Sequence, residues 1–268
     1  MQEPGTVCAL AIAGSDSGGG AGIQADLKTF AAHRVHGLSA IAALTAQHTR
    51  GVVAVHVPPA GFLRAQIDAC FDDFAIGAIK LGMLANVETV AAVADALEAH
   101  APVPVVLDPV MVATSGARLL EDAALDALRR RLLPRASLLT PNLPEAELLL
   151  GRRIRDRAAM RAACGALLAC GAGAVLLKGG HLEEEADTVL DLYADADGMH
   201  EMTHPRLPRS AHGTGCTLAS AVAAQLCLGR SRREACVAAT GYVHRALAGG
   251  YAPGRGGVLV LDHIGAAA

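Results

Sequence analysis

The stretch His212-Gly213-Thr214-Gly215-Cys216 runs directly into Thr217–Leu226, a mostly apolar segment of good helix formers. The two glycines let the backbone approach a ligand without a Cβ in the way. The first turn of a helix has unpaired N–H groups and the positive end of the helix dipole, so we predict an anion site that suits phosphate. A plain connection before a buried helix is the usual explanation of an isolated Gly-x-Gly. Cys216 favours the site, because the same positive field is expected to lower the pKa of its thiol and make it a base or nucleophile.

Elsewhere in the chain, short runs of Val, Ile and Leu alternate with longer Ala-rich periodic segments. This alternation predicts an α/β fold, with a mainly parallel sheet covered by helices on both faces. We expect buried strands at Val7–Ala13, Leu38–Leu44, Ala78–Leu81, Val105–Leu107, Leu138–Leu139 and Ala174–Leu177. We expect helices at Ile23–His33, Gly61–Phe74, Val87–His100, Glu121–Leu132, Pro144–Leu150, Ala158–Cys170, Thr217–Leu228 and Arg232–Ala248. Gly51–Val57 has the alternation of a half-exposed edge strand or lid, and Thr188–Ala194 with Met199–His204 predicts a hairpin.

The composition excludes several classes of protein. The 268 residues, 52% hydrophobic and 18% charged, predict one domain with largely buried elements. A net charge of −3 and only 3% aromatic residues argue against a nucleic-acid partner. We see no signal peptide and no apolar run that could cross a membrane, so we expect no membrane partner. Seven cysteines without a Cys-x-x-Cys pair argue against a disulfide framework or a zinc site and suit a reducing cytoplasm.

Polar residues follow most of the predicted strands. Ligands of open parallel sheets bind beyond the carboxyl ends of the strands, so these residues should share one rim. They are Gly14–Gly22, Thr45-Ala-Gln47-His48, Gly82-Met83, Asp108-Pro-Val110-Met111, Thr140-Pro-Asn142-Leu-Pro-Glu145 and Lys178-Gly-Gly180-His181. Together with the anion site they supply what phosphoryl transfer needs: ligands for Mg²⁺, neutralisation of charge and positioning.

Each rim residue also has an interpretation without chemistry. Lys178 could be a surface lysine and Asp108 a turn residue. Asn142 and Glu145 could form a helix-capping pair. Gln47 could be a satisfied polar group, and Met83 could fill the core. Only their shared placement argues against these interpretations.

A dinucleotide fingerprint is a further alternative, because Gly20–Ala25 fits Gly-x-Gly-x-x-Ala. That fingerprint requires an acidic residue at the end of the second strand, and this strand ends in Leu44-Thr-Ala-Gln47. A Walker A sequence is also absent. We therefore expect any nucleotide to be held by another device.

The combined motifs resemble those of the bacterial hydroxymethylpyrimidine/phosphomethylpyrimidine kinases, in the ribokinase-like superfamily. The resemblance extends from about Leu10 to about Tyr242 and is carried by Gly14–Phe30, Ala46–Thr49, Lys80–Met83, Leu139–Ala146, Lys178–His181 and His212–Thr217. It implies a three-layer fold and a homodimer. It also implies that ATP with Mg²⁺ phosphorylates 4-amino-5-hydroxymethyl-2-methylpyrimidine and then its monophosphate.

The resemblance also implies roles for individual residues. Gln47 would bind the aminopyrimidine edge, because its amide offers a donor and an acceptor together. The remaining substrate contacts would come from Gly14, Asp26, Met83 and Val110. The metal would be held by Asn142, Glu145 and Asp108, and the ATP contacted by Lys178, Asn142, Thr140 and His212. Gly213, Thr214 and Gly215 would form the anion hole with Lys178 nearby, and Cys216 occupies the position of a catalytic base that is usually Asp.

Two positions depart from the family pattern, and three other functions stay open. Ser17 stands where relatives often have Pro, and Ser210-Ala211 where they often have Asn-Thr, so we assign no adenine contacts there. A pyridoxal kinase is the nearest alternative, since pyridoxal is also a flat ring with a CH₂OH group. A pyrimidine-binding protein without activity is disfavoured by the complete phosphate machinery, and a nicotinamide dehydrogenase by the missing acidic residue.

Overall fold

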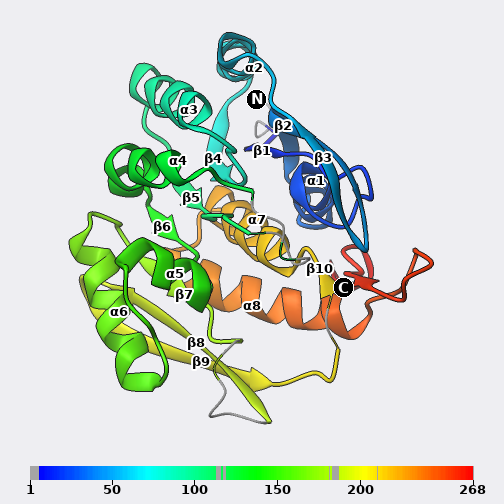
Figure 1. The fold of residues 1–268 in the computed structure, drawn as a ribbon, viewed down its shortest axis with the longest axis vertical. Coiled ribbons are helices and arrows are strands. Elements are labelled where there is room, and N and C mark those ends of the chain that lie inside the picture. Colours follow the sequence, from blue (N-terminus) through cyan, green and yellow to red (C-terminus); the bar gives the residue numbers. More distant parts are fainter. Residues whose placement is uncertain are drawn as a thin grey trace, which may run out of the picture.

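In this computed structural model, a twisted sheet runs through the protein with helices on both of its faces (Figure 1). The structure describes residues 6–112, 116, 119–180, 182, 187–209 and 211–267. Its strands are β1 (Cys8–Gly14), β2 (His36–His48), β3 (Gly51–His56), β4 (Ile76–Leu81), β5 (Val105–Leu107), β6 (Leu138–Leu139), β7 (Val175–Leu177), β8 (Thr188–Asp195) and β9 (Gly198–Pro205). Within these residues the sheet order is β3-β2-β1-β4-β5-β6-β7-β8-β9.

The middle of the sheet is parallel and its edges are antiparallel. Parallel pairing joins β2, β1, β4, β5, β6 and β7. Strand β3 pairs antiparallel with β2, and the hairpin of β8 and β9 extends the other edge. The predicted α/β class, the edge strand and the hairpin are therefore confirmed. Every residue of β1 is buried, as expected of a strand that has helices on both sides.

The helices form two layers with separate cores. One core lies between the sheet and α2 (Ala60–Asp73), α3 (Val87–Ala99), α4 (Asp122–Ala127), α5 (Leu143–Leu150) and α6 (Arg157–Ala169). The other core lies between the opposite face and α1 (Gly22–Ala32), α7 (Thr214–Cys227) and α8 (Arg232–Ala248). Helix α7 is buried along most of its length, so its first turn is held firmly against the sheet.

Three elements differ from the sequence prediction. Strand β2 continues through Gln47 to His48 because β3 pairs with its second half, so Gln47 lies on a strand rather than after one. The predicted helix Glu121–Leu132 is a short α4 followed by a π-helical turn, Leu128–Leu132. Helix α7 begins at Thr214, preceded by β10 (Ala211–His212), which pairs with β11 (Leu259–Val260). Among the described residues we find no helix with the length and apolarity needed to cross a membrane.

Candidate active site

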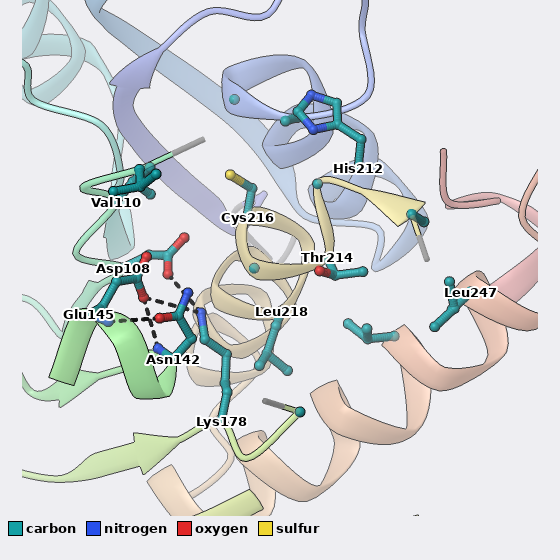
Figure 2. Close-up of a pocket in the computed structure, with 18 of the residues that line it drawn as sticks. Asp108, Val110, Asn142, Glu145, Lys178, His212, Thr214, Cys216, Leu218 and Leu247 are labelled. Atoms are coloured by element: carbon teal, nitrogen blue, oxygen red, sulfur yellow. Dashed lines mark hydrogen bonds and ion pairs between the residues drawn. The ribbon is translucent and has the colours of Figure 1, made fainter. Parts of the chain in front are cut away.

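A cavity of about 650 Å³ lies at the carboxyl ends of the strands, beside the start of α7 (Figure 2). Most of the predicted site residues line it, although they come from segments that are far apart in the sequence. They are Gly14, Gln47, Met83, Asp108, Val110, Asn142, Glu145, Lys178, His212, Gly213, Thr214, Gly215 and Cys216. His181 and Ser210, which belong to the motifs discussed above, lie outside the described residues.

The first turn of α7 has the geometry of an anion site. Gly213 is the N-cap residue, with a φ of 89°. As a glycine it has no side chain that could accept a hydrogen bond from the amides of the first turn. A Cβ on Gly213 would lie 1.9 Å from the carbonyl oxygen of Gly20, so only glycine fits. The next residues, Thr214, Gly215 and Cys216, line the cavity, and first-turn amides have no partner within a helix. The structure therefore presents the positive end of α7 to the cavity.

The thiol of Cys216 does not have the expected lowered pKa. In Figure 2 its sulfur lies at the top of α7, on the side facing Val110 and His212. Burial raises its pKa to about 11, and the charges of Asp26 and Asp108 act in the same direction. Lys80 and the amide of Gly22 oppose this shift without reversing it. The predicted lowering of this pKa is therefore wrong for the free protein, because burial outweighs the charge of Lys80 and the amide of Gly22.

A cluster of charges lies at the ends of β5, β6 and β7, next to the first turn of α7. Lys178 Nζ lies 3.2 Å from Asp108 Oδ1 and 3.9 Å from Glu145 Oε2. Asn142 and Glu145 form a reciprocal capping box at the start of α5, in which each side chain accepts an amide of the other at 2.8 Å. The capping interpretation is thus confirmed, and it fixes Glu145 against the cavity. The free carboxylate oxygens and the ammonium group can serve a charged ligand at the same time.

This cluster has the chemistry expected of a magnesium site. Burial, together with the charge of Asp108, raises the pKa of Glu145 to about 7, although Lys178 opposes the shift. A dication would reverse this repulsion, and carboxylate oxygens are suitable Mg²⁺ ligands. The described residues contain no group of three or more His, Cys, Asp or Glu side chains placed to hold a metal. Asp108 and Glu145 therefore fit a Mg²⁺ ion that keeps waters and phosphate oxygens as its other ligands.

Two residues that were predicted to contact a ligand do not line the cavity. Thr140, predicted to contact ATP, is completely buried beneath Asp108, and its hydroxyl lies 3.4 Å from Asp108 Oδ1. Asp26, predicted to contact the substrate, is also completely buried and lies outside the cavity lining. Both side chains instead support charged groups that do reach the cavity.

The group that Asp26 supports is Lys80, which belongs to the motif Lys80–Met83 but was not predicted as a site residue. Lys80 lines the cavity, although it has no exposed surface. Its Nζ lies 2.8 and 2.9 Å from the two carboxylate oxygens of Asp26, and Ser220 donates a hydrogen bond of 2.6 Å to the same carboxylate. Burial alone would lower the pKa of Lys80, but the charge of Asp26 raises it well above its usual value. Ser220 lies one helical turn after Cys216 on α7, so this ion pair lies beneath the start of the helix.

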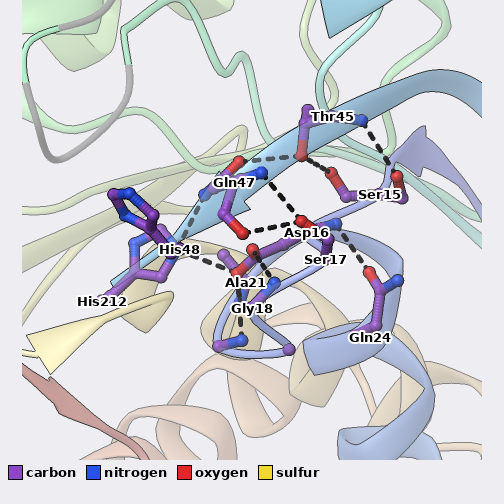
Figure 3. A network of polar contacts seen from close by, with 12 residues as sticks. Ser15, Asp16, Ser17, Gly18, Ala21, Gln24, Thr45, Gln47, His48 and His212 are labelled. Carbon is purple, nitrogen blue, oxygen red and sulfur yellow. Dashed lines mark hydrogen bonds and ion pairs between the residues drawn. The ribbon is translucent and has the colours of Figure 1, made fainter. Parts of the chain in front are cut away.

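The glycine-rich loop before α1 binds its own carboxylate. Asp16 accepts hydrogen bonds from the amides of Gly18, Gly20 and Ala21 at 2.8 to 3.0 Å (Figure 3). The position that a phosphate would take in a dinucleotide fingerprint is therefore filled by Asp16. His212, which we expected to contact ATP, places Nε2 3.0 Å from Asp16 and 2.9 Å from the amide nitrogen of Gln47. Its ring thus belongs to the end of the cavity that contains Gln47.

Comparisons with known proteins agree with this geometry. A family model described as phosphomethylpyrimidine kinase matches residues 16–260. The chain belongs to the phosphomethylpyrimidine kinase family. It is 51% identical over 244 residues to a hydroxymethylpyrimidine/phosphomethylpyrimidine kinase of Rhizobium meliloti, covering 90% of this chain and 91% of the relative. It is 50% identical over 218 residues to the enzyme of that name from Escherichia coli, covering 81% of each chain.

Solved structures place this family within a wider group of vitamin kinases. A phosphomethylpyrimidine kinase of Clostridium difficile has a TM-score of 0.81 and 38% identity, covering 90% of this chain and 99% of that one. A pyridoxal kinase of Staphylococcus aureus, solved with AMP-PCP and pyridoxal, has a TM-score of 0.88 and 32% identity, covering 97% and 94%. The ribokinase-like fold and the kinase family are thus both confirmed.

Replacing Gly213 with Ala should destabilise the protein and abolish activity, because the methyl group would collide with the Gly20 carbonyl at a positive φ. Gly215→Ala is the matched control, since this helical residue has an ordinary φ and its Cβ would meet only the ends of two side chains, Lys178 Nζ at 3.2 Å and the Asp108 carboxylate at 3.7 Å. We expect a melting temperature lowered by several degrees for Gly213→Ala alone, and lower activity in both variants. Equal melting temperatures in thermal unfolding would contradict the assigned role of Gly213.

Lys80→Met should lower the free energy of unfolding by about 3 to 5 kcal/mol, because it leaves the buried Asp26 carboxylate without its cation. The double variant Lys80→Met with Asp26→Leu removes both charges and should recover most of that loss. Urea unfolding measures both values. A single variant as stable as the wild type would show that the ion pair does not hold this part of the core.

Proposed function

We propose that the protein transfers the γ-phosphoryl group of ATP to the hydroxymethyl oxygen of 4-amino-5-hydroxymethyl-2-methylpyrimidine. A second transfer converts the monophosphate to the diphosphate used in thiamine synthesis. The observation that carries the proposal is the arrangement of one cavity, which has an anion site at α7, a thiol beside it and an amide side chain, Gln47, at the end facing His212. The related hydroxymethylpyrimidine/phosphomethylpyrimidine kinases of Rhizobium meliloti and Escherichia coli support the choice of substrate.

The residues of the cavity divide the work of phosphoryl transfer. The amides at the start of α7 bind the oxygens of the migrating group, whose charge spreads over them in a loose transition state. Lys178 neutralises charge on the phosphates from beside the first turn of α7, where its Nζ would lie 3.2 Å from a Cβ on Gly215. Asp108 and Glu145, positioned by Asn142, would hold Mg²⁺, which supplies further charge neutralisation between the phosphates when bound. These contacts position the donor in line with the acceptor alcohol.

Cys216 would face the acceptor alcohol. With a pKa of about 11 its thiol is protonated in the free protein, so it orients the hydroxyl group before transfer. A loose transition state needs little removal of the proton until late in the reaction. We propose that Cys216 positions the alcohol through its neutral thiol, and that the alcohol proton passes to an oxygen of the transferred phosphoryl group late in the reaction, as the bond to phosphorus forms.

A pyridoxal kinase activity is the second candidate, and the solved pyridoxal kinases of the same fold favour it. Both acceptors are flat heteroaromatic rings with a CH₂OH group. Gln47 offers an acceptor and a donor side by side, which match the amino group and ring nitrogen of an aminopyrimidine. Pyridoxal lacks this pair of groups on one edge, so we propose the pyrimidine as the preferred substrate and pyridoxal as at most a side activity.

A coupled ADP-release assay with the aminopyrimidine alcohol, its monophosphate and pyridoxal tests this order. We expect turnover with the first two and a kcat/KM for pyridoxal at least tenfold lower. Cys216→Ala should lower kcat for the alcohol at least tenfold while leaving the melting temperature within a few degrees. A preference for pyridoxal would overturn the substrate assignment, and near-normal turnover of Cys216→Ala would remove the role given to the thiol.

We also propose that the protein is a homodimer that acts in a reducing cytoplasm as a single kinase domain. Support for the compartment comes from the cysteines, all seven of which are free in the structure. Support for the dimer comes from apolar side chains on and near the edge strand β3: Leu44 (43% exposed), Val53 (73%), Val55 (43%) and Phe62 (63%). An exposed apolar edge strand invites pairing with a second copy.

Val53→Lys should shift the protein from dimer to monomer, because it places a charge within this apolar edge. Val237→Lys on α8, where the native side chain is 57% exposed, is the matched control and should stay dimeric. Light scattering coupled to size exclusion gives the mass of each variant. A monomeric wild type, or a dimer unaffected by Val53→Lys, would contradict this interface.

A further inference from the structure

A hydrogen-bond conflict surrounds Gln47, and its resolution determines how the substrate is oriented. Gln47 Nε2 lies 2.9 Å from His212 Nε2, and the same nitrogen of His212 lies 3.0 Å from Asp16 Oδ2 (Figure 3). A neutral or charged imidazole has at most one proton on this nitrogen. The nitrogen can therefore donate to Asp16 or accept from an amide N–H group, but it cannot do both.

Asp16 decides between these two states. The carboxylate accepts three backbone amides and is almost fully buried, with 1% of its surface exposed. Backbone amides donate to both carboxylate oxygens, Gly18 to Oδ1 and Gly20 and Ala21 to Oδ2. Although burial opposes ionisation, hydrogen bonds hold the pKa of Asp16 below its usual value. An ionised carboxylate accepts hydrogen bonds and cannot donate one. His212 Nε2 must therefore carry a proton and donate it to Asp16.

With that proton in place, only one orientation of the Gln47 amide is satisfied. If the amide nitrogen faced His212, two donors would oppose each other. If the amide is turned by 180°, its oxygen shares the single His212 Nε2 proton with Asp16 Oδ2 in a bifurcated hydrogen bond. Its nitrogen donates to Thr45 Oγ1 on the other side, where the two side chains lie 3.2 Å apart. The hydroxyl oxygen of Thr45 can accept this hydrogen bond, because its own proton is donated to the carbonyl oxygen of Ser15 at 2.9 Å. Every group in the network then has a partner.

We propose that Asp16, acting through His212, fixes the Gln47 amide with its oxygen toward His212, and thereby fixes the direction in which an aminopyrimidine binds. This inference rests on the proposed function for its substrate. The second lone pair of the amide oxygen binds the amino group at the His212 end. The second N–H group binds the ring nitrogen at the Thr45 end.

The consequence for the reaction follows from the ring itself. In the proposed substrate, the amino-bearing carbon lies between the ring nitrogen and the carbon that bears CH₂OH. An amino group at the His212 end therefore directs CH₂OH beyond that end. His212 precedes Cys216 by four residues on the segment that begins α7, and the Cys216 sulfur faces the same side as His212 (Figure 2). The opposite amide orientation would turn CH₂OH away from the thiol. Asp16 and His212 are thus positioning residues for the acceptor.

The first test needs no substrate. Nitrogen-15 NMR of histidine-labelled protein, with the His212 signal assigned by its loss in His212→Leu, reports which ring nitrogen carries a proton. We expect a proton on Nε2 near neutral pH. A His212 ring with its proton on Nδ1 alone would overturn the proposal, whatever the enzyme phosphorylates.

The second test uses the 4-oxo analogue of the pyrimidine alcohol, which presents a carbonyl oxygen and a ring N–H in place of the amino group and ring nitrogen. The wild type should prefer the amino compound, because the fixed amide mismatches the analogue. His212→Leu frees the amide to rotate, so the ratio of the two kcat/KM values should fall at least tenfold. His36→Leu, an exposed histidine at the other end of β2, is the control and should keep the wild-type ratio.

The outcomes of this test separate the two proposals. A ratio unchanged in His212→Leu would overturn the role of the Asp16–His212 pair. A wild type inactive on the amino compound would instead overturn the proposed function, and the NMR result on the free protein would still decide the orientation.

Discussion

The unpaired amides at the start of α7 are the interaction on which the rest of the site depends. They face the cavity because Gly213 takes a left-handed conformation that brings it against the carbonyl of Gly20. The helix that carries them is buried along most of its length between the sheet and the neighbouring helices. A rigid helix cannot adjust to a phosphate, so the other groups of the cavity are arranged around it. This explains why polar side chains at several strand ends face one helix terminus.

Two ion pairs balance the charge in this region. Lys178 lies between Asp108 and Glu145, beside the first turn of α7, and lines the cavity. Lys80 lies beneath the helix start with Asp26 as its partner. The first pair is open to the cavity and available to a ligand and a dication. The second is fully buried, and it sets the electrostatic environment of Cys216. Both cations lie close enough to Cys216 for their charges to interact with its thiol, Lys178 from the cavity and Lys80 from the buried side.

Much of this arrangement could be predicted from the sequence, because alternating apolar runs predict parallel strands and the rim follows from where those strands end. The predictions that were wrong failed because the sequence does not show which polar side chains are buried. Thr140 and Asp26 belong to the expected motifs, but a motif does not reveal whether a side chain reaches the cavity or supports one that does. The pKa of Cys216 depends on desolvation and on Asp26 and Asp108, none of which a sequence can place. Asp16 lies within a glycine-rich run, and only the folded loop shows that the amides of this run bind the Asp16 side chain.

The orientation of Gln47, at the acceptor end of the cavity, likewise depends on contacts that the sequence does not show. A glutamine can present its amide in two orientations, and the neighbours of Gln47 come from the loop after β1, from β2 and from the segment before α7. Only their combined hydrogen bonds choose one orientation, so no local pattern in the sequence could have indicated it. Phosphate binding and substrate orientation are therefore linked through one short segment, His212–Cys216.

A crystal structure with ADP, aluminium fluoride, Mg²⁺ and the aminopyrimidine alcohol would test the central claim most directly. The account predicts fluoride atoms within hydrogen-bond distance of the amides of Thr214, Gly215 and Cys216, and the alcohol oxygen beside the Cys216 sulfur. A fluoride group bound away from the start of α7, or a sulfur turned into the protein interior, would contradict it.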